Sequence, residues 1–237
     1  LHPILRVRAE RMIAMSASLS PGLDTEVVEA LRRNRATYAE LPAVYERTGA
    51  FRREQAKRWL LSPLEALRPR RRGDRLLELG SADGYLTGML DEIGYDVTAV
   101  EYTPQMCEAT RRNAPSAEVV EAEFLSHHFD DTYDVVLCSA FVHLFPPPYD
   151  RAVLLKVRDL LADGGIAYLA TTVHSEYSSG YEAKGSSGHR FRTRYTHEEV
   201  VDLITSAGLE VRTHHSAQDR LEAEKVWGNW FVARTDS

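Results

Sequence analysis

From Arg75 to Thr172 the sequence alternates short apolar stretches with amphipathic ones. Apolar runs of strand length occur at 75–79, 96–100, 117–121, 133–139 and 165–172, and helical patterns lie between them at about 84–93, 104–113 and 150–161. Strands that alternate with helices predict a parallel sheet covered on both faces. The runs DVVLCSA and GIAYLATT are almost uninterrupted, as expected of strands buried on both faces. The sequence therefore predicts a doubly wound α/β fold.

The region before the first strand differs in character. Residues 1 to about 67 carry apolar residues at helical spacing, for example Val27 and Leu31. An Arg-rich stretch, RPRRRGD at 68–74, follows them and is interpreted as a solvated linker, with a phosphate contact as the alternative. We therefore expect a helical N-terminal cap or arm, residues 1–72, and a main domain, residues 73–237.

The end of the chain adds an irregular segment and further regular structure. Residues 173–195 are rich in Gly and Ser but carry Tyr, His and Arg side chains, which predicts a substrate loop or lid. Thr196 and Glu199 have the spacing of a capping box, so a helix should begin there. Strand candidates follow at 209–215 and 227–234.

Composition narrows the classes of partner. The 237 residues include 29 Lys and Arg against 35 Asp and Glu, a formal net charge of -6, so the chain lacks the basic character of a general nucleic-acid binder and a small-molecule partner is favoured. Cys107 and Cys138 show no disulfide or metal spacing and are expected to be buried, reduced thiols. No apolar run approaches the roughly 20 residues of a membrane helix, and charge interrupts the first residues too often for a secretory signal. A cytoplasmic protein without a membrane partner is expected.

The turn ELGSADG, Glu78–Gly84, joins the first strand to the next helix. A chain that leaves a parallel strand through glycines exposes backbone N–H groups at the helix start, and Glu101 ends the second strand where such folds place a carboxylate on a ribose. A nucleoside ligand is indicated. A phosphate-binding P-loop would need Gly-Lys-Ser/Thr, which is absent. Glu78 and Asp83 would repel the pyrophosphate of a dinucleotide but suit a ligand with an ammonium and a sulfonium, which favours S-adenosylmethionine over NAD.

An ordered series of segments strengthens this interpretation. In chain order they are LLELGSADG, VTAVEYTPQM, VVEAEFL, YDVVLCSAFVHLF and LLADGGIAYLAT. Over residues 75–235 the sequence resembles the class I S-adenosylmethionine-dependent methyltransferases of small-molecule type. The resemblance implies a Rossmann-like fold, with a mostly parallel seven-stranded sheet that closes on an antiparallel hairpin. Ala82 stands where this family often has glycine, and Glu123 where it usually has aspartate.

The resemblance also assigns residues to the methyl donor, S-adenosyl-L-methionine, whose product is S-adenosyl-L-homocysteine. It implies that Glu101 binds the ribose, with Tyr102 and Met106 near the adenine. Glu123 would face the adenine amino group, and Phe124 would flank the ring. The full set of expected donor-binding residues is Tyr45, Glu78, Gly80, Ser81, Asp83, Gly84, Glu101, Tyr102, Met106, Glu123, Phe124 and Ser139.

A histidine follows the fourth strand, where related enzymes border the donor and the acceptor. This residue is His143, in the run SAFVHLFPPPYD. Methyl transfer chiefly requires alignment and exclusion of water, and a base is needed only where the acceptor must lose a proton. His143 is the candidate catalytic base, with plain packing against the neighbouring loop as the alternative. His174, after the fifth strand, is a second candidate.

Acceptor contacts are expected from aromatic and basic side chains near both ends of the chain. In the segment 173–195 the candidates are His174, Tyr177, Tyr181 and Arg192, with His189 and Tyr195 also available. Tyr38 and Tyr45 stand in a region from which related enzymes often cover the donor with a tyrosine. Their separation of seven residues fits packing on one helix face equally well.

The leading hypothesis is methyl transfer to an O or N atom of a small metabolite, for instance in secondary metabolism, without a nucleic-acid partner. A protein or RNA methyltransferase that docks through RPRRR, and a non-catalytic regulator that binds S-adenosylmethionine, are the alternatives. The pairs His127–His128 and His214–His215 cannot both face one ion from a regular strand, so no metal is predicted. The oligomeric state is left open, a homodimer being one option.

Overall fold

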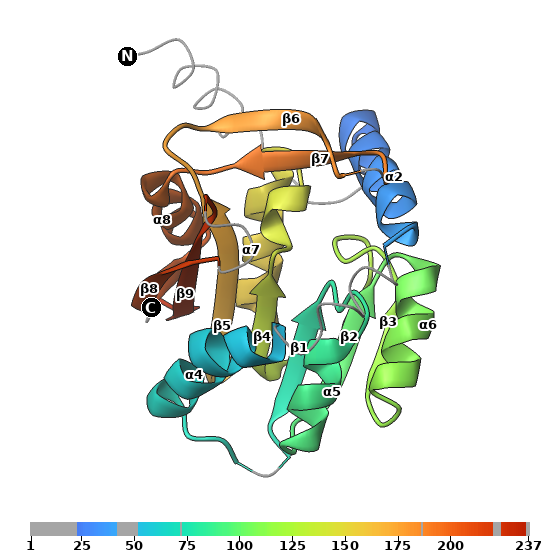
Figure 1. The fold of residues 1–237 in the computed structure, drawn as a ribbon. Helices are drawn as coiled ribbons and strands as arrows, with labels where there is room; N and C mark the ends of the chain where they lie inside the picture. Colours follow the sequence, from blue (N-terminus) through green and yellow to red (C-terminus); the bar gives the residue numbers. More distant parts are fainter. Residues whose placement is uncertain (1–22, 42–51, 72, 186, 220–223, 236–237) are drawn as a thin grey trace.

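The structure, a computed structural model, describes residues 23–41, 52–71, 73–185, 187–219 and 224–235 of the chain. Its main feature is a seven-stranded sheet in the order β3-β2-β1-β4-β5-β9-β8 (Figure 1). The strands are β1 (Arg75–Leu79), β2 (Asp96–Glu101), β3 (Glu118–Glu121), β4 (Tyr133–Ser139), β5 (Leu161–Val173), β8 (Leu209–Gln218) and β9 (Val226–Arg234). Strands β1 to β5 are parallel, and β9 is antiparallel to both β5 and β8. The predicted mostly parallel sheet with a terminal antiparallel pair is confirmed.

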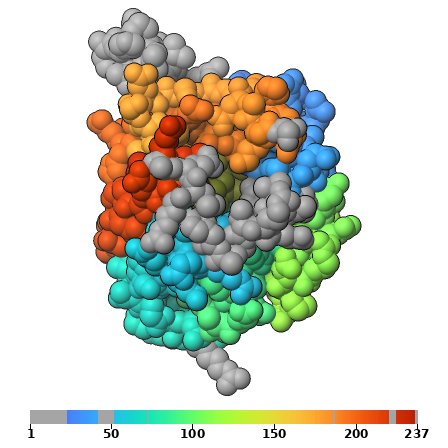
Figure 2. All heavy atoms as spheres, viewed as in Figure 1, coloured from blue at the N-terminus to red at the C-terminus, as the bar shows by residue number. Residues whose placement is uncertain are grey.

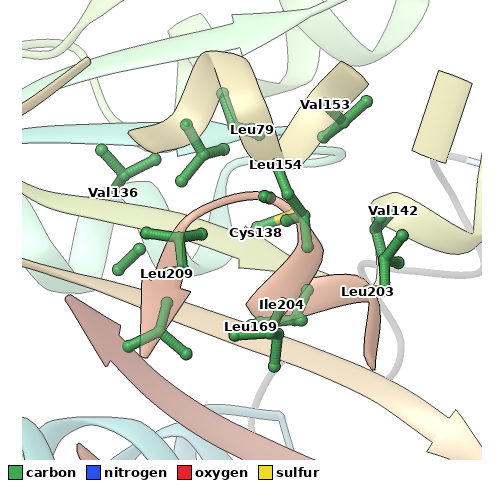
Figure 3. Packing of buried hydrophobic residues seen from close by; sticks show 14 of the residues in the cluster. Leu79, Val136, Cys138, Val142, Val153, Leu154, Leu169, Leu203, Ile204 and Leu209 are labelled. Atoms are coloured by element: carbon green, nitrogen blue, oxygen red, sulfur yellow. The ribbon is translucent and has the colours of Figure 1, made fainter. Parts of the chain in front are cut away.

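Helices cover both faces of this sheet (Figure 1). They include α5 (Tyr85–Glu92), α6 (Pro104–Asn113), α7 (Tyr149–Leu160) and α8 (His197–Ser206), with a 3-10 turn η2 (Val142–Leu144) after β4. Leu76 of β1 packs in a cluster with residues of α5, whereas its neighbour Leu77 packs in another with residues of α7 and α8. Figure 3 shows the second cluster, in which Leu154 and Ile204 surround Cys138 of β4. Since successive strand residues face opposite sides, each central strand contributes to two apolar layers.

The described N-terminal residues are helical, as expected. They form α2 (Thr25–Ala39) and a second helical stretch over 52–67 that contains a π-helical turn, η1 (Lys57–Leu61), and α4 (Ser62–Leu67). Leu60 and Leu64 of this stretch pack on the sheet in the cluster of Leu76. The division of the chain at residue 72 stays a prediction.

The Arg-rich stretch after α4 is held more firmly than a solvated linker. Arg68 pairs with Asp74 at 2.6 Å and with Asp134 at 2.7 Å, and its side chain is only 16% exposed. These ion pairs fasten the start of β1 to the start of β4. The first guanidinium of the stretch is therefore occupied within the protein.

Residues 173–195 form regular structure where the sequence predicted a loop. Strands β6 (Ser178–Ala183) and β7 (His189–Arg194) pair antiparallel in a separate two-stranded sheet, called here the hairpin β6–β7. Tyr181 lies opposite Phe191, with ring centroids 5.6 Å apart, and Glu182 lies opposite Arg190. The expectation of a loop failed because Gly, Ser and charged residues mask the two-residue alternation of these strands.

The hairpin crosses the carboxyl ends of the parallel strands and packs against α2 (Figure 1). Asn34 fixes this contact, since its Oδ1 accepts from the backbone N–H of Phe191 at 2.7 Å and its Nδ2 donates to the carbonyl of Leu144 at 3.0 Å. Thr37 donates to the carbonyl of His189 at 2.8 Å. Helix α2 thus joins the hairpin to the segment after β4.

Two further expectations concern the cysteines and the helix after the hairpin. Cys107 and Cys138 are buried and free, as predicted. Thr196 and Glu199 form the predicted capping box at the start of α8. Over the residues that the structure describes, none of the helices combines the length and apolar character needed to cross a membrane.

Candidate active site

A cavity of about 440 Å³ lies where the parallel strands end. Its lining comes from the turn after β1, the ends of β2, β4 and β5, the segment after β3, α2 and the hairpin β6–β7. In Figure 2 the hairpin (orange) and α2 (blue) lie side by side on this face of the molecule. Ligand pockets span roughly 300–1,000 Å³, so the cavity suits a small organic molecule.

The turn after β1 depends on two glycines. Gly80 has φ +70°, and a Cβ there would lie 2.8 Å from Cδ2 of Phe141. Gly84 has φ +75°, and a Cβ there would lie 2.5 Å from the Cα of Thr110. Left-handed backbone with so little space requires glycine. The turn therefore packs tightly against α6 and the segment after β4.

Ala82, the departure from the family pattern, also has a positive φ of 51°. Its backbone N–H donates to Oε2 of Glu101 at 3.1 Å, while the N–H of Thr103 donates to Oε1 at 2.8 Å. Such a conformation costs an L-residue roughly 1–2 kcal/mol. The carboxylate at the end of β2 thus holds the strained turn beside the cavity.

Three carboxylates gather at this turn. Asp83 is paired by Arg52 through bonds of 2.9 and 2.6 Å, and the Arg52 guanidinium lies 3.8 Å from the ring centroid of Tyr85. Glu78 accepts from the hydroxyl of Thr87 at 2.6 Å and lines the cavity. Burial, together with the nearby charges of Asp83 and Glu101, raises the pKa of Glu78 to about 8. Burial likewise raises the pKa of Glu101. A cationic ligand group beside Glu78 would favour the ionised form of its carboxyl group.

The structure brings most of the expected donor-binding residues to one wall. Those that line the cavity are Glu78, Gly80, Ser81, Glu101, Tyr102, Met106, Glu123, Phe124 and Ser139. Asp83 and Gly84 lie behind the turn, where they support it. The carboxylate of Glu123 accepts from the N–H groups of Leu125 and Ser126 at 2.9 and 2.8 Å. Tyr45 lies outside the described residues. These roles stay predictions, and the charge pattern of this wall fits an adenosine-bearing sulfonium.

His143 also lines this cavity and is 2% exposed. Its Nδ1 is 3.0 Å from Oγ1 of Thr171. Burial lowers the pKa of His143 well below its usual range, and the positive charges of Arg192, Arg190, Lys184 and His174 lower it further. The imidazole is therefore neutral near pH 7, the form that can accept a proton.

The acceptor candidates from 173–195 separate into two groups. Arg192 lines the cavity, whereas the lining residues do not include His174, Tyr177 or Tyr181. His174 Nε2 lies 3.0 Å from Oγ1 of Thr172, so it sits behind a lining residue. Tyr181 is 45% exposed and lies under the guanidinium of Arg33. Tyr181 pairs with Phe191 on the hairpin face opposite to that of Arg190 and Arg192, which turns it away from the cavity.

The two remaining candidates of this segment, Tyr195 and His189, lie outside the cavity lining. The buried Tyr195 donates to Oδ2 of Asp150 at 2.9 Å, and Tyr177 packs near its ring. His189 is exposed at the start of β7.

Several lining residues were missed at the level of sequence. They include Asn34, Trp59, Tyr168, Lys184, Arg190, Trp227 and Asn229, whereas Tyr38, which the sequence did suggest, also lines the cavity. Tyr168 of β5 donates to Oδ1 of Asn229 on β9 at 2.5 Å, a contact that depends on the register of two strands far apart in sequence. The alternation of Arg190, Phe191 and Arg192 was the available signal for a strand with a charged face. Over the described residues, no group of three or more His, Cys, Asp or Glu is placed to hold a metal ion.

Comparisons with known proteins agree with this geometry. Residues 76–165 match the family described as "Methyltransferase domain". The ubiquinone biosynthesis O-methyltransferase of Xanthomonas euvesicatoria pv. vesicatoria is 24% identical over 176 residues, which cover 63% of this chain and 72% of that protein.

Solved structures share the whole architecture. The DhpI–SAH complex superposes with a TM-score of 0.65 at 19% identity and covers 88% of this chain and 98% of its own. The 1,6-didemethyltoxoflavin-N1-methyltransferase of Burkholderia thailandensis, with bound S-adenosylhomocysteine, has a TM-score of 0.64 at 17% identity and covers 92% and 94%. The fold is therefore a Rossmann-like methyltransferase fold. Within this fold, residues 76–165 are a methyltransferase domain.

Proposed function

We propose that this chain transfers a methyl group from S-adenosylmethionine to an O or N atom of a small metabolite in the cytoplasm, for instance in secondary metabolism. The observation that carries the proposal is that the carboxylates of the β1–β2 wall and the neutral imidazole of His143 line one cavity of about 440 Å³. The named activities of similar proteins, an O-methyltransferase and an N1-methyltransferase on small molecules, support this choice.

The donor supplies an electrophilic methyl group on a sulfonium, and its departure leaves a neutral thioether. The chain's part is to hold both molecules in line and to exclude water. The hairpin β6–β7 and α2, joined through Asn34, border the acceptor side of the cavity. They would limit access of bulk solvent during the reaction.

His143 would take the proton that a hydroxyl or ammonium acceptor loses. In the tautomer in which Nδ1–H donates to Thr171, the lone pair is on Nε2. A buried, neutral imidazole keeps that lone pair free of protons at neutral pH. The proton passes from the acceptor to Nε2, and the acceptor's electron pair forms the new bond to the methyl carbon.

Isothermal titration with S-adenosylmethionine and S-adenosylhomocysteine tests the donor assignment. Glu101→Gln replaces an acceptor of two backbone N–H groups with an amide that can accept through one atom only, so we expect affinity to fall roughly 10- to 100-fold. Glu121→Gln is the matched control, because Glu121 pairs with Glu101 in register on β3 but is exposed and outside the cavity.

The proposal fails if the folded wild type binds neither compound, or if both variants bind equally well. Tight binding without turnover of any acceptor in a broad panel would instead favour the regulator. Salt-sensitive binding to RNA would favour a nucleic-acid substrate.

A further inference from the structure

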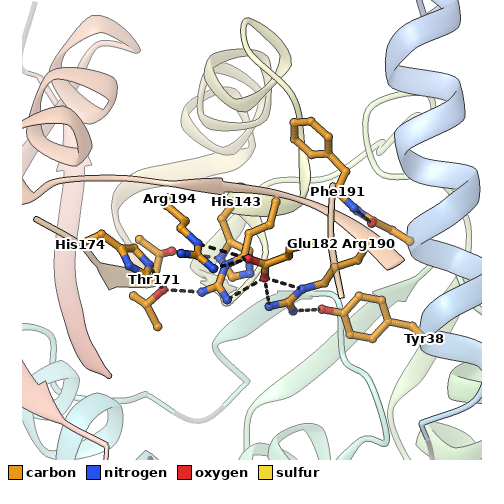
Figure 4. A network of polar contacts seen from close by, with 11 residues as sticks. Tyr38, His143, Thr171, His174, Glu182, Arg190, Phe191 and Arg194 are labelled. Carbon is orange, nitrogen blue, oxygen red and sulfur yellow. Dashed lines mark hydrogen bonds and ion pairs between the residues drawn. The ribbon is translucent and has the colours of Figure 1, made fainter. Parts of the chain in front are cut away.

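The hairpin β6–β7 carries three arginines that share one carboxylate. Arg190, Arg192 and Arg194 lie within 2.8, 3.3 and 2.7 Å of the oxygens of Glu182 (Figure 4). Three positive charges and one negative charge leave this cluster at about +2. These residues alternate along β7 and so occupy one face of the strand, which explains how a single glutamate reaches all of them.

Two of these charges are buried on the cavity wall. The side chains of Arg190 and Arg192 are each 8% exposed, and both line the cavity, whereas that of Arg194 is 49% exposed and does not. A buried charge without a counter-charge is unfavourable because it loses its hydration. Among the residues that the structure describes, Glu182 is the carboxylate paired with both Arg190 and Arg192.

The neighbouring groups satisfy hydrogen bonds but do not supply negative charge. Nη1 of Arg190 donates to the hydroxyl of Tyr38 at 2.8 Å, and Nη2 of Arg192 donates to that of Thr172. Nε of Arg192 is buried and has no hydrogen-bond partner among the described residues. Burial lowers the pKa of Arg192 and the charge of Arg190 lowers it further, whereas Tyr38 and Glu182 raise the pKa of Arg190, so Arg192 is the less compensated of the two.

We propose that Arg190 and Arg192 bind an oxyanion of the acceptor, a carboxylate or a phosphoryl group, in the same cavity as His143. This inference rests on the proposed function, since it names the chemical class of that function's acceptor. Guanidinium groups recognise both oxyanions through paired N–H donors. Arg192 and His143 are bonded to the consecutive residues Thr172 and Thr171 of β5, so one strand end positions both groups.

The test uses the folded chain saturated with S-adenosylhomocysteine, titrated with inorganic phosphate, methylphosphonate, acetate and, as a neutral control, acetamide. Isothermal titration gives the affinity, and ¹H–¹⁵N spectra of arginine Nε–H groups report on Arg192 directly. We expect saturable binding of at least one anion, a shift of the Arg192 Nε–H resonance, and no response to acetamide. Response to phosphate and methylphosphonate alone identifies a phosphoryl acceptor, and response to acetate identifies a carboxylate.

Matched variants distinguish an effect of the cavity arginines on anion binding from an effect of the total charge of the hairpin. Arg192→Met should weaken anion binding about tenfold or more, since it removes charge-assisted hydrogen bonds. Arg194 also pairs with Glu182 but is exposed, so Arg194→Met removes an equal charge outside the cavity. This variant should change the affinity for the anion less than twofold. Arg192→Lys keeps the charge and should retain part of the affinity.

The proposal is overturned if no anion binds saturably to the wild type, or if Arg194→Met loses as much affinity as Arg192→Met. The wild-type titration decides alone should Arg192→Met not fold. Binding of S-adenosylhomocysteine is measured separately and reports on the proposed function. The anion titration is repeated without S-adenosylhomocysteine, which distinguishes failure of the donor site from failure of the anion site.

Discussion

Nδ1 of His143 and Oγ1 of Thr171 are 3.0 Å apart, which joins the turn after β4 to the end of β5 beneath the hairpin. Both residues are buried. The bond fixes the ring orientation and, with it, the nitrogen that can face an acceptor. The partner of the ring is the hydroxyl of Thr171 and not a carboxylate. The hydroxyl therefore orients the imidazole of His143 but adds no negative charge that would raise the pKa of His143.

We predict that Thr171→Val lowers kcat about tenfold, because the ring loses its orienting bond while its base function is retained. His143→Gln should lower kcat by roughly 10²–10⁴-fold, the usual contribution of a general base. Steady-state kinetics with a proton-bearing acceptor measures both effects, and titration calorimetry checks that S-adenosylhomocysteine affinity changes less than threefold.

Thr213→Val on β8 is the control, since Thr213 lies on the same sheet but outside the cavity. A His143→Gln enzyme with undiminished kcat would show that His143 only packs against the neighbouring loop.

The raised pKa of Glu78 predicts that stability depends on pH. An unfolded glutamate ionises near pH 4.5, whereas Glu78 in the folded chain ionises at about 8, so the folded state binds more protons between these values. The free energy of unfolding should therefore fall as pH rises from about 4.5 to 8, by up to a few kcal/mol.

Glu78→Gln should remove this fall, because the amide does not ionise and can still accept from Thr87. Urea unfolding at several pH values between 5 and 8.5 measures the slope for each protein. Glu92→Gln, at an exposed position, should keep the wild-type slope. Equal slopes in wild type and Glu78→Gln would contradict the prediction.

The turn after β1 offers two substitutions of opposite sign. Gly84→Ala should destabilise the chain by more than about 1 kcal/mol, since its Cβ would lie 2.5 Å from the Cα of Thr110 at a positive φ. Ala82→Gly should be neutral or stabilising by up to about 1 kcal/mol, because glycine relieves the strain at φ 51°. Chemical unfolding of both variants at one pH provides the comparison, and the same sign for both would show that the positive φ values do not govern the turn.

The part of the cavity formed by the parallel strands could be predicted from the sequence more completely than the part formed by the hairpin β6–β7. β1 and β4 were predicted to the residue because continuous apolar runs end at polar turns, and parallel strands bring those turns to one edge. The family resemblance predicted the donor-binding residues of this edge, and most of them line the cavity. The acceptor side depends on the hairpin β6–β7, where Arg190 and Arg192 are buried although arginine is usually exposed. Asn229 reaches the cavity only through the register of β9 with β5.

The positive charges around His143 predict how its pKa responds when an arginine of the hairpin β6–β7 is replaced. The groups that lower its pKa are Arg190, Arg192 and Lys184 of the hairpin segment and His174 after β5. Arg192→Met removes one of these positive charges, so the pKa of His143 should rise toward its usual value near 6.5. The acidic limb of the kcat/KM profile should move to higher pH by the same amount, because the base must be neutral to accept a proton. NMR titration of the His143 ring measures the shift directly. The charge of Arg194 is not among the largest effects on the pKa of His143, so Arg194→Met should leave the limb nearly in place. An equal displacement in that variant would mean that the overall charge of the hairpin, not the buried Arg192, sets the basicity of the imidazole.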